Sequence, residues 1–359
     1  MTSINAMRID RDSGLCICDE ARYWNPEWMI FYTPEKIRSV VNRQIQHEQG
    51  LVLFMGTTGT SSIGDEFIDQ TEKQITRNYE LECKKHDGMP PVFMGVEEAA
   101  LLSFEVITRV KRVHVDDMLR GRYGFTGDDL VAGYYERAGA HYEIADAATI
   151  GKGCNYMTFD GMPADVKGIY GNSQVLAGYH PDEGFRIFYM TTRMPVCEEV
   201  QEIFLAQGSG RDTCDLVYCD YTVARSKQER RCRIDRVEAV MTMLRGLTHA
   251  YRMTAGVGGY PKIIYFNGLQ DDPDLRVKEL FDRRSRLAFE IESAKNEGLV
   301  SRENAYELIE DLVFKDKSFP EINEAFLRAA SDTYRLLRFL RGYTLRSSLD
   351  KDDGKESGR

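Results

Sequence analysis

The same order of elements occurs twice along this chain, and this repetition restricts the fold more than any other feature. In the first half, strand-like segments lead through the glycine-containing loop 56–62 into two amphipathic stretches. In the second half, strand-like segments lead through Gly208, Ser209 and Gly210 into two further amphipathic stretches and a last strand. Strands joined by short turns form antiparallel hairpins, and amphipathic helices bury their apolar side on another layer. The pattern therefore predicts an α+β fold.

Hydrophobic periodicity locates the individual elements. Alternating residues and turn clusters predict a hairpin over residues 4–18 and a second one that leaves along 36–41 and returns along 51–55. Apolar side chains at every fourth position predict a helix over 62–84. The same reasoning predicts helices over 96–113 and 235–252 and a helix carrying Cys214 and Tyr221, with strands at 173–179, 185–190, 202–206 and 261–266.

Two stretches fall outside the repeated order. Residues 115–172 are rich in Gly and Tyr with weak periodicity, which predicts an insertion or an irregular subdomain. After residue 267 the pattern is helical, over 274–298, 302–314 and 320–342, and the charged end of the chain from residue 347 is predicted to be disordered. We therefore divide the chain into core halves at 1–113 and 173–267, an insertion at 114–172, a helical extension at 268–345 and a tail at 346–359.

Charge and cysteine usage restrict partners and compartment. The 57 acidic and 47 basic side chains give a formal net charge of −10, which disfavours nucleic acid and anionic membrane surfaces as partners. Apolar runs such as 51–55 are too short to span a bilayer, and the first residues lack a basic segment followed by an apolar one. Eight cysteines without a CxxC pair and scattered histidines predict reduced thiols, no metal, no cofactor and a cytoplasmic protein.

Several local segments, in this order, resemble the proteasome β-subunit family of N-terminal nucleophile hydrolases, and in particular the bacterial HslV and Anbu-type proteins. Residues 14–22 resemble the family's strand that ends in an aspartate, and 33–37 resemble the segment that supplies its lysine. Residues 53–59 resemble the strand and glycine turn before the first helix. Residues 205–210, with their Gly-Ser-Gly turn, resemble the turn before the third helix. The resemblance covers roughly 2–113 and 173–267 and implies a four-layer αββα sandwich.

The resemblance also implies a catalytic set made of Thr2, Asp19, Lys36, Gly56 and Ser209. A threonine that becomes the first residue carries its own base, because an α-amino group has a pKa of about 7.7–8.0. Removal of Met1 would expose Thr2, and 17 residues separate it from Asp19, as they separate Asp19 from Lys36. Lys36 would lower the pKa of the hydroxyl, Asp19 would orient Lys36, and the Gly56 N–H would donate to the oxyanion.

Two segments depart from the family's pattern. The family commonly places an aspartate and a serine before its last strand, whereas residues 251–259 contain no acidic side chain and offer Thr254 as a substitute. Arg22 is displaced by one residue from the usual arginine. Both departures bear on activity more than on fold.

Three functions follow as hypotheses. The first is a threonine peptidase or amidohydrolase acting on peptide or protein substrates inside a self-assembled ring or larger particle. The second is a catalytically inactive proteasome-like subunit whose insertion and C-terminal helices mediate assembly, and the third is a ligand-binding protein that kept the cleft and lost the chemistry. An Asp-Lys pair in a hairpin can also be an ion pair without function. The loop 56–62 lacks the lysine of a phosphate-binding loop.

Overall fold

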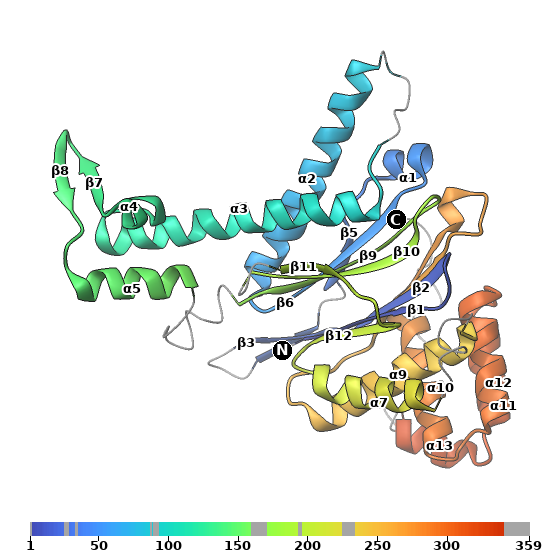
Figure 1. The fold of residues 1–359 in the computed structure, drawn as a ribbon. Helices are drawn as coiled ribbons and strands as arrows, with labels where there is room; N and C mark the ends of the chain where they lie inside the picture. The colour runs from blue at the N-terminus through green and yellow to red at the C-terminus, as the bar shows by residue number, and fades with distance from the viewer. Residues whose placement is uncertain are drawn as a thin grey trace.

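The fold is mixed α+β, with antiparallel sheets and helices on their outer faces (Figure 1). A computed structural model describes the residues 2–24, 29–32, 35–86, 88, 93–158, 171–192, 196–224 and 234–340. Within these residues no helix is both long and apolar enough to cross a bilayer.

The first sheet has five strands in the order β12-β1-β2-β13-β14. The strands are β12 (Phe204–Gly208), β1 (Ser3–Arg8), β2 (Ser13–Cys18), β13 (Lys262–Asn267) and β14 (Val277–Leu280). All neighbours are antiparallel, and the register places Ser3 opposite Gly208 and Ile4 opposite Cys18. The sheet thus joins the two predicted core halves, because β2 of the first half lies between β1 of the same half and β13 of the second half.

The second sheet also has five antiparallel strands, in the order β11-β10-β9-β6-β5. The strands are β11 (Val196–Glu199), β10 (Gly184–Thr191), β9 (Ser173–His180), β6 (Val52–Thr58) and β5 (Ile37–Ser39). The second predicted hairpin is confirmed as β5 and β6. Its polar connection forms the short helix α1 (Arg43–Gln49), which Asn42 caps by accepting from the Ile45 amide at 2.9 Å.

The two sheets face each other across an apolar layer. Phe54 of the second sheet and Phe266 of the first meet edge to face with ring centroids 5.6 Å apart. Cys16 and Cys18 alternate along β2 and lie buried in the same layer as free thiols. Aligned stacking of this kind is the usual way for two sheets to bury their inner faces.

Helices cover the outer face of each sheet (Figure 1). Residues on the other side of the pleat, such as Leu53 and Met55, pack against α2 (Ser61–Lys85) and α3 (Val96–Tyr123). On the first sheet, Leu15 and Ile17 pack against α7 (Arg211–Val223) and α9 (Arg236–Met253). The predicted helices over 62–84 and 235–252 are confirmed, and the helix expected over 96–113 continues for ten further residues.

In its described part the stretch after residue 113 is an arm of helices and a hairpin, so the expectation of irregular structure there is wrong, while the division of the chain that makes it an insertion stays a prediction. The end of α3 is joined by α4 (Gly127–Ala132), the hairpin of β7 (Tyr134–Arg137) and β8 (Ala140–Glu143), and α5 (Ala147–Thr158). These elements extend away from the sheets (Figure 1). Buried Leu119, Phe125 and Leu130 continue the core of the second sheet into the arm. Short elements of this kind show little periodicity, because they bury few side chains.

The C-terminal stretch differs from prediction in two places. Val277–Leu280 is the edge strand β14, not helix, and the helix α10 (Asp282–Asn296) begins only after it. The helix expected over 320–342 is two helices, α12 (Phe319–Ala329) and α13 (Thr333–Leu340). The break occurs because Ala330 is extended and pairs with Val300, and Asp332 then accepts from the Arg335 amide at 2.9 Å.

The remaining described elements are short. They are the hairpin of β3 (Ala21–Trp24) and β4 (Met29–Tyr32), the turn η1 (Pro273–Leu275), the helix α11 (Arg302–Ile309) and the π-helical turn η2 (Glu310–Phe314) that extends it. The predicted disorder from residue 347 onward falls outside the described residues.

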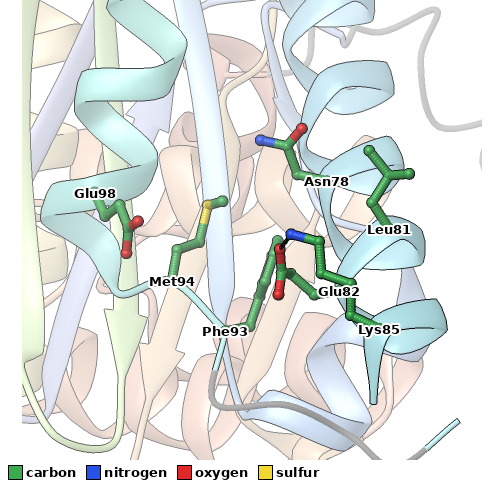
Figure 2. Close-up of a pocket in the computed structure, with 7 residues that line it drawn as sticks. All are labelled: Asn78, Leu81, Glu82, Lys85, Phe93, Met94 and Glu98. Carbon is green, nitrogen blue, oxygen red and sulfur yellow. Dashed lines mark hydrogen bonds and ion pairs between the residues drawn. The ribbon is translucent and has the colours of Figure 1, made fainter. Parts of the chain in front are cut away.

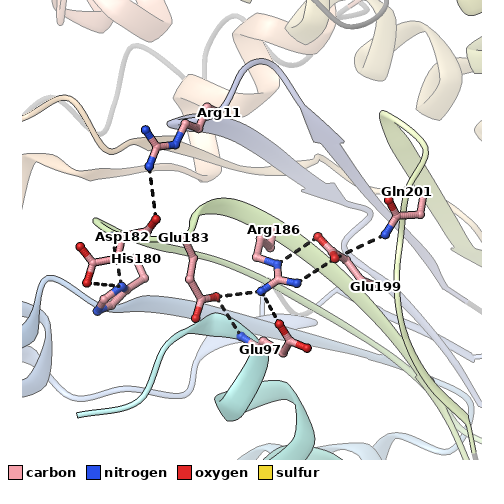
Figure 3. A network of polar contacts seen from close by, with 8 residues as sticks. All are labelled: Arg11, Glu97, His180, Asp182, Glu183, Arg186, Glu199 and Gln201. Carbon is pink, nitrogen blue, oxygen red and sulfur yellow. Dashed lines mark hydrogen bonds and ion pairs between the residues drawn. The ribbon is translucent and has the colours of Figure 1, made fainter. Parts of the chain in front are cut away.

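A partly buried cation, Arg186, holds the edge of the second sheet to the helix layer (Figure 3). The Arg186 guanidinium on β10 donates to both oxygens of Glu199 on β11, at 3.0 and 2.8 Å. Its remaining nitrogen donates to Glu97, at the start of α3, at 2.8 Å and to Glu183 at 3.0 Å. Arg186 lowers the pKa of Glu199, so the network stays charged at neutral pH.

Candidate active site

The centre of the candidate site is the buried carboxylate of Asp19, which follows strand β2 directly. Its Oδ1 accepts from the Ser3 amide at 2.7 Å, and its Oδ2 accepts from the Gly258 amide at 3.2 Å. Both amides come from distant parts of the chain that the first sheet brings beside β2. The carboxylate is therefore held in one orientation by backbone groups.

Lys36 meets this carboxylate from the start of β5 in the other sheet. Its Nζ donates to Asp19 Oδ1 at 2.7 Å and also to the carbonyl oxygen of Ala21. The side chains of Lys36 and Asp19 are 4% and 0% exposed, so the ion pair lies almost entirely out of water. A buried pair of this kind costs desolvation and is a poor source of stability by itself. Its presence at a strand end marks the position as a candidate site.

Burial raises the pKa of the Asp19 carboxyl above its usual range, whereas the Lys36 ammonium and the amides of Ser3 and Gly258 act in the opposite direction. The Lys36 ammonium and the two backbone amides thus keep the Asp19 carboxylate ionised, and this carboxylate is in turn the counter-charge of the ammonium. The two side chains form one electrostatic unit, and a change to either affects both.

Thr2 lies beside this unit, one residue before the Ser3 amide that binds Asp19. It is half-exposed and precedes β1, and its carbonyl oxygen accepts from the Gly210 amide at 3.4 Å. The structure thereby brings together Thr2, Asp19 and Lys36, which the sequence separates by equal intervals. A hydroxyl residue, an ammonium and a carboxylate at one strand end are the groups needed to activate an oxygen nucleophile.

The Gly-Ser-Gly turn between β12 and α7 closes over Thr2. Gly208 has φ 94°, and a Cβ at this position would lie 2.1 Å from the Thr2 carbonyl oxygen. Only glycine fits such a backbone at that distance. The next residue, Ser209, is exposed in the turn and follows the pairing of Gly208 with Ser3. Ser209 therefore lies where the β12 strand passes Thr2.

Gly56 occupies a different environment from the one expected. The Thr57 amide donates to the Lys36 carbonyl at 3.4 Å, so Thr57 is directed at β5. Successive residues of a strand direct their amides to opposite sides, so the Gly56 amide is directed at β9, where it lies opposite Val175. This pairing corrects the expectation that Gly56 supplies an oxyanion donor, since its N–H belongs to the sheet.

Gly59 lies three residues further on, where the chain leaves β6 and enters α2. Its φ of 109° requires glycine, and the neighbouring Thr58 side chain lies 3.3 Å from the position of a Cβ on Gly208. The turn at Gly59 therefore adjoins the same glycine that covers Thr2. Helix α2 starts here with Thr60 as its N-cap and no side-chain hydrogen bond to its first amides. Amides and helix dipole give this turn a partial positive charge.

A buried hydroxyl behind Asp19 was not anticipated as part of the site. Tyr251, near the end of α9, stacks obliquely on Phe289 at 5.2 Å, and no described residue bonds its hydroxyl. Burial raises its pKa well above the usual range, and the charge of Asp19 adds to the shift. Neighbouring Ala250 would contact a Cβ on Gly210, which places this end of α9 against the Thr2 turn. Tyr251 falls at the end of the predicted helix 235–252, and its sequence context offered no signal of a functional role.

Thr254 caps the end of α9, and its amide donates to the Ala250 carbonyl at 2.9 Å. The sequence offered Thr254 as a substitute for an acidic residue, and the hydroxyl that lies beside the charge of Asp19 belongs to Tyr251. Among the described residues no three His, Cys, Asp or Glu side chains gather as metal ligands.

A pocket separate from the candidate site lies between the end of α2 and the start of α3 (Figure 2). It measures about 390 Å³, and Phe93 and Met94 form its floor while Glu82, Lys85 and Glu98 surround it. None of the residues around Asp19 contributes to it. Its charged side chains are of both signs, and Glu82 and Lys85 bind each other at 2.5 Å.

No protein-family model matches the sequence, and no curated protein matches it as a relative.

Proposed function

We propose that this chain is a proteasome-like N-terminal nucleophile hydrolase, a threonine peptidase or amidohydrolase that becomes active when Met1 is removed. The observation that carries the proposal is the convergence of Ser3, Lys36 and Gly258 on the buried Asp19 carboxylate, directly beside Thr2. A buried ion pair held by two backbone amides at a strand end is costly, and a catalytic role explains why it is kept.

The stacking of the elements supports the same proposal. Two facing antiparallel sheets, with α2 and α3 on one outer face and α7 and α9 on the other, fit a four-layer αββα sandwich. The candidate site lies where β1, β2 and β5 bring the two sheets together. Thr2 is thus placed at the edge of the inner layer, where an extended substrate can reach it.

The proposed chemistry uses the chain's own terminus as base. Thr2 Oγ attacks the carbonyl carbon of an amide, and its proton passes to the Thr2 α-amino group. The amine returns that proton to the leaving nitrogen as the C–N bond breaks, and an ester remains on Thr2. Water then hydrolyses the ester, again with the amine as base, and the free hydroxyl is restored.

Lys36, Asp19 and the turn at Gly59 assist these steps. The Lys36 ammonium favours the ionised form of the Thr2 hydroxyl, and Asp19 keeps that ammonium charged and directed at the site. The oxyanion donor is the turn at Gly59 and the first amides of α2, in place of Gly56. Tyr251 occupies the stretch where the family commonly has an aspartate, and its buried hydroxyl carries no hydrogen bond from a described residue.

Intact-mass measurement and a fluorogenic peptide-amide assay test this proposal together. We expect the purified protein to lack Met1 and to release the fluorophore, and Thr2→Ala to reduce the rate by about 10³-fold or more, because the nucleophile is lost. Thr2→Ser is the matched control and should retain part of the rate. Protein that keeps Met1, or a Thr2→Ala variant as active as the wild type, would contradict the proposal.

One observation favours the second candidate, a non-catalytic assembly subunit. The arm formed by the end of α3, α4, β7, β8 and α5 extends from the body (Figure 1). Several of its large apolar side chains are exposed. Val131 is 78% exposed, and Tyr134 and Tyr142 are nearly half exposed. Such a surface suits contact with another copy of the chain, and it fits a ring or larger particle under either candidate.

A further inference from the structure

A pocket of about 380 Å³ lies where the C-terminal helices meet the core, apart from the residues around Thr2. Three of its lining side chains are cations from three different helices, namely Arg245 of α9, Lys295 of α10 and Arg302 of α11. These helices lie together on the outer side of the first sheet (Figure 1). The volume falls in the range of small-molecule sites, about 300–1,000 Å³.

The cations outnumber their acidic partners. Arg302 lies 3.7 Å from Glu238, and Lys295 lies 3.9 Å from the fully buried Glu292. Both separations exceed a hydrogen-bond length, so neither carboxylate uses the donors fully. Arg245 forms no hydrogen bond or ion pair with any described residue. Three positive charges thus face two negative ones in a partly enclosed space.

The charges are close enough to affect one another. Burial lowers the pKa of Lys295, Glu292 opposes this, and the charges of Arg245 and Arg302 lower it further. Protein structures rarely keep like charges together without a counter-charge, because each destabilises the ionised form of the others. The missing counter-charge is one anionic group placed between the three donors.

The remaining walls are apolar or aromatic. Met241 and Tyr221 are buried, and Tyr306 also lines the pocket. The Arg302 guanidinium lies 5.0 Å from the Tyr306 ring centroid, which holds it at the rim. A ligand with one anionic end and an apolar organic part matches a pocket that has one cationic wall and one apolar wall better than a bare ion does.

We propose that this pocket binds a small organic molecule through a phosphate group. Arginine forks and a lysine are the side chains that bind phosphate oxygens best, and three donors suit its three terminal oxygens. Thr242, three residues before Arg245 on the same face of α9, adds a hydroxyl donor, and Glu238 stays with Arg302 as its ion-pair partner. The site is independent of the proposed hydrolase activity, so Thr2→Ala should bind like the wild type.

Isothermal titration calorimetry of the full chain, at fixed ionic strength, tests the site with inorganic phosphate and with phenyl phosphate. We expect saturable one-to-one binding, tighter for phenyl phosphate, and a Kd raised about tenfold or more in Arg245→Gln. Arg328→Gln, a charge removal on the exposed face of α12, is the matched control and should bind normally. Arg245→Lys keeps the charge and should lie between the two.

Absence of saturable binding by both probes, or unchanged binding in Arg245→Gln, would overturn the proposal. Equal affinities for the two probes would overturn the inference that the ligand has an organic part, and inorganic phosphate would then be the ligand. If Arg245→Gln loses its circular dichroism signal, Arg302→Gln and Arg245→Lys decide the result in its place.

Discussion

At the scale of single residues, the molecule's most demanding feature is the Asp19–Lys36 pair. Both charges are buried out of water. Their mutual attraction and the hydrogen bonds from the amides of Ser3 and Gly258 offset the desolvation free energy. Nearby Tyr251 buries a hydroxyl that no described residue binds. Polar groups gathered at such cost in one place indicate function more strongly than stability.

Removing the charge of Asp19 or of Lys36 alone should destabilise the protein strongly. We expect Lys36→Met or Asp19→Asn to lower the free energy of unfolding by about 3–5 kcal/mol, because each leaves the other group buried without its partner. The double variant should lose less than the sum of the two, since no unpaired charge remains. Urea unfolding of the four proteins measures this coupling.

The exposed pair of Arg43 and Asp274 provides the control for that cycle. Arg43 is 77% exposed, so Arg43→Met should change the free energy of unfolding far less than either buried variant. Additive losses in the Asp19 and Lys36 variants would show that the two side chains do not act as a unit.

At the scale of elements, local pattern and long-range pairing have different roles. Helix α2 follows from side chains at every fourth position, and its buried residues include Ile63, Phe67 and Tyr79 as the periodicity predicts. Strand β14 has only four residues and takes its conformation from pairing with β13. Short edge strands carry too little pattern to be distinguished from the start of a helix.

The β12–α7 turn allows a direct test of this dependence on tertiary contact. Gly208→Ala should lower the free energy of unfolding by more than Gly133→Ala, because both force a side chain into a left-handed backbone but only Gly208 meets the Thr2 carbonyl. We expect about 1 kcal/mol for Gly133, where no atom lies within 4 Å, and at least about 2 kcal/mol for Gly208.

Thermal or urea unfolding measures both glycine variants. Under the proposed activity, Gly208→Ala should also reduce peptide-amide hydrolysis, whereas Gly133→Ala should leave it unchanged. Equal losses in the free energy of unfolding at the two positions would mean that the turn changes its backbone without moving Thr2.

At the scale of the whole molecule, the sheets and their helices form one body, and two additions extend it. The arm continues the core of the second sheet outward, and the C-terminal helices continue the core of the first. The phosphate pocket lies between the second addition and the body, and the exposed apolar side chains belong to the first addition. The additions thus supply binding surfaces, while the proposed chemistry belongs to the body.

Assembly through the arm is testable by changing its apolar side chains. We expect wild-type protein to sediment as an oligomer, and Val131→Glu combined with Tyr134→Ser to shift it to smaller species, because an interface does not tolerate a buried unpaired charge. Leu269→Glu, at an exposed position after β13, is the control and should sediment like the wild type. An unchanged distribution in the arm variant would exclude the arm as the contact.

The sequence by itself determined the main strands and helices of the two core halves, because periodicity and turn residues act over short windows. Thr2, Asp19, Lys36 and Ser209 came from the resemblance to a family and not from the local pattern. Tertiary structure alone decided what these residues contact. Gly258 reaches Asp19 across 239 positions, and the side of β6 to which the Gly56 amide points depends on which strands flank it. The phosphate pocket requires three helices to meet. Such contacts depend on chain closure, which no local pattern encodes.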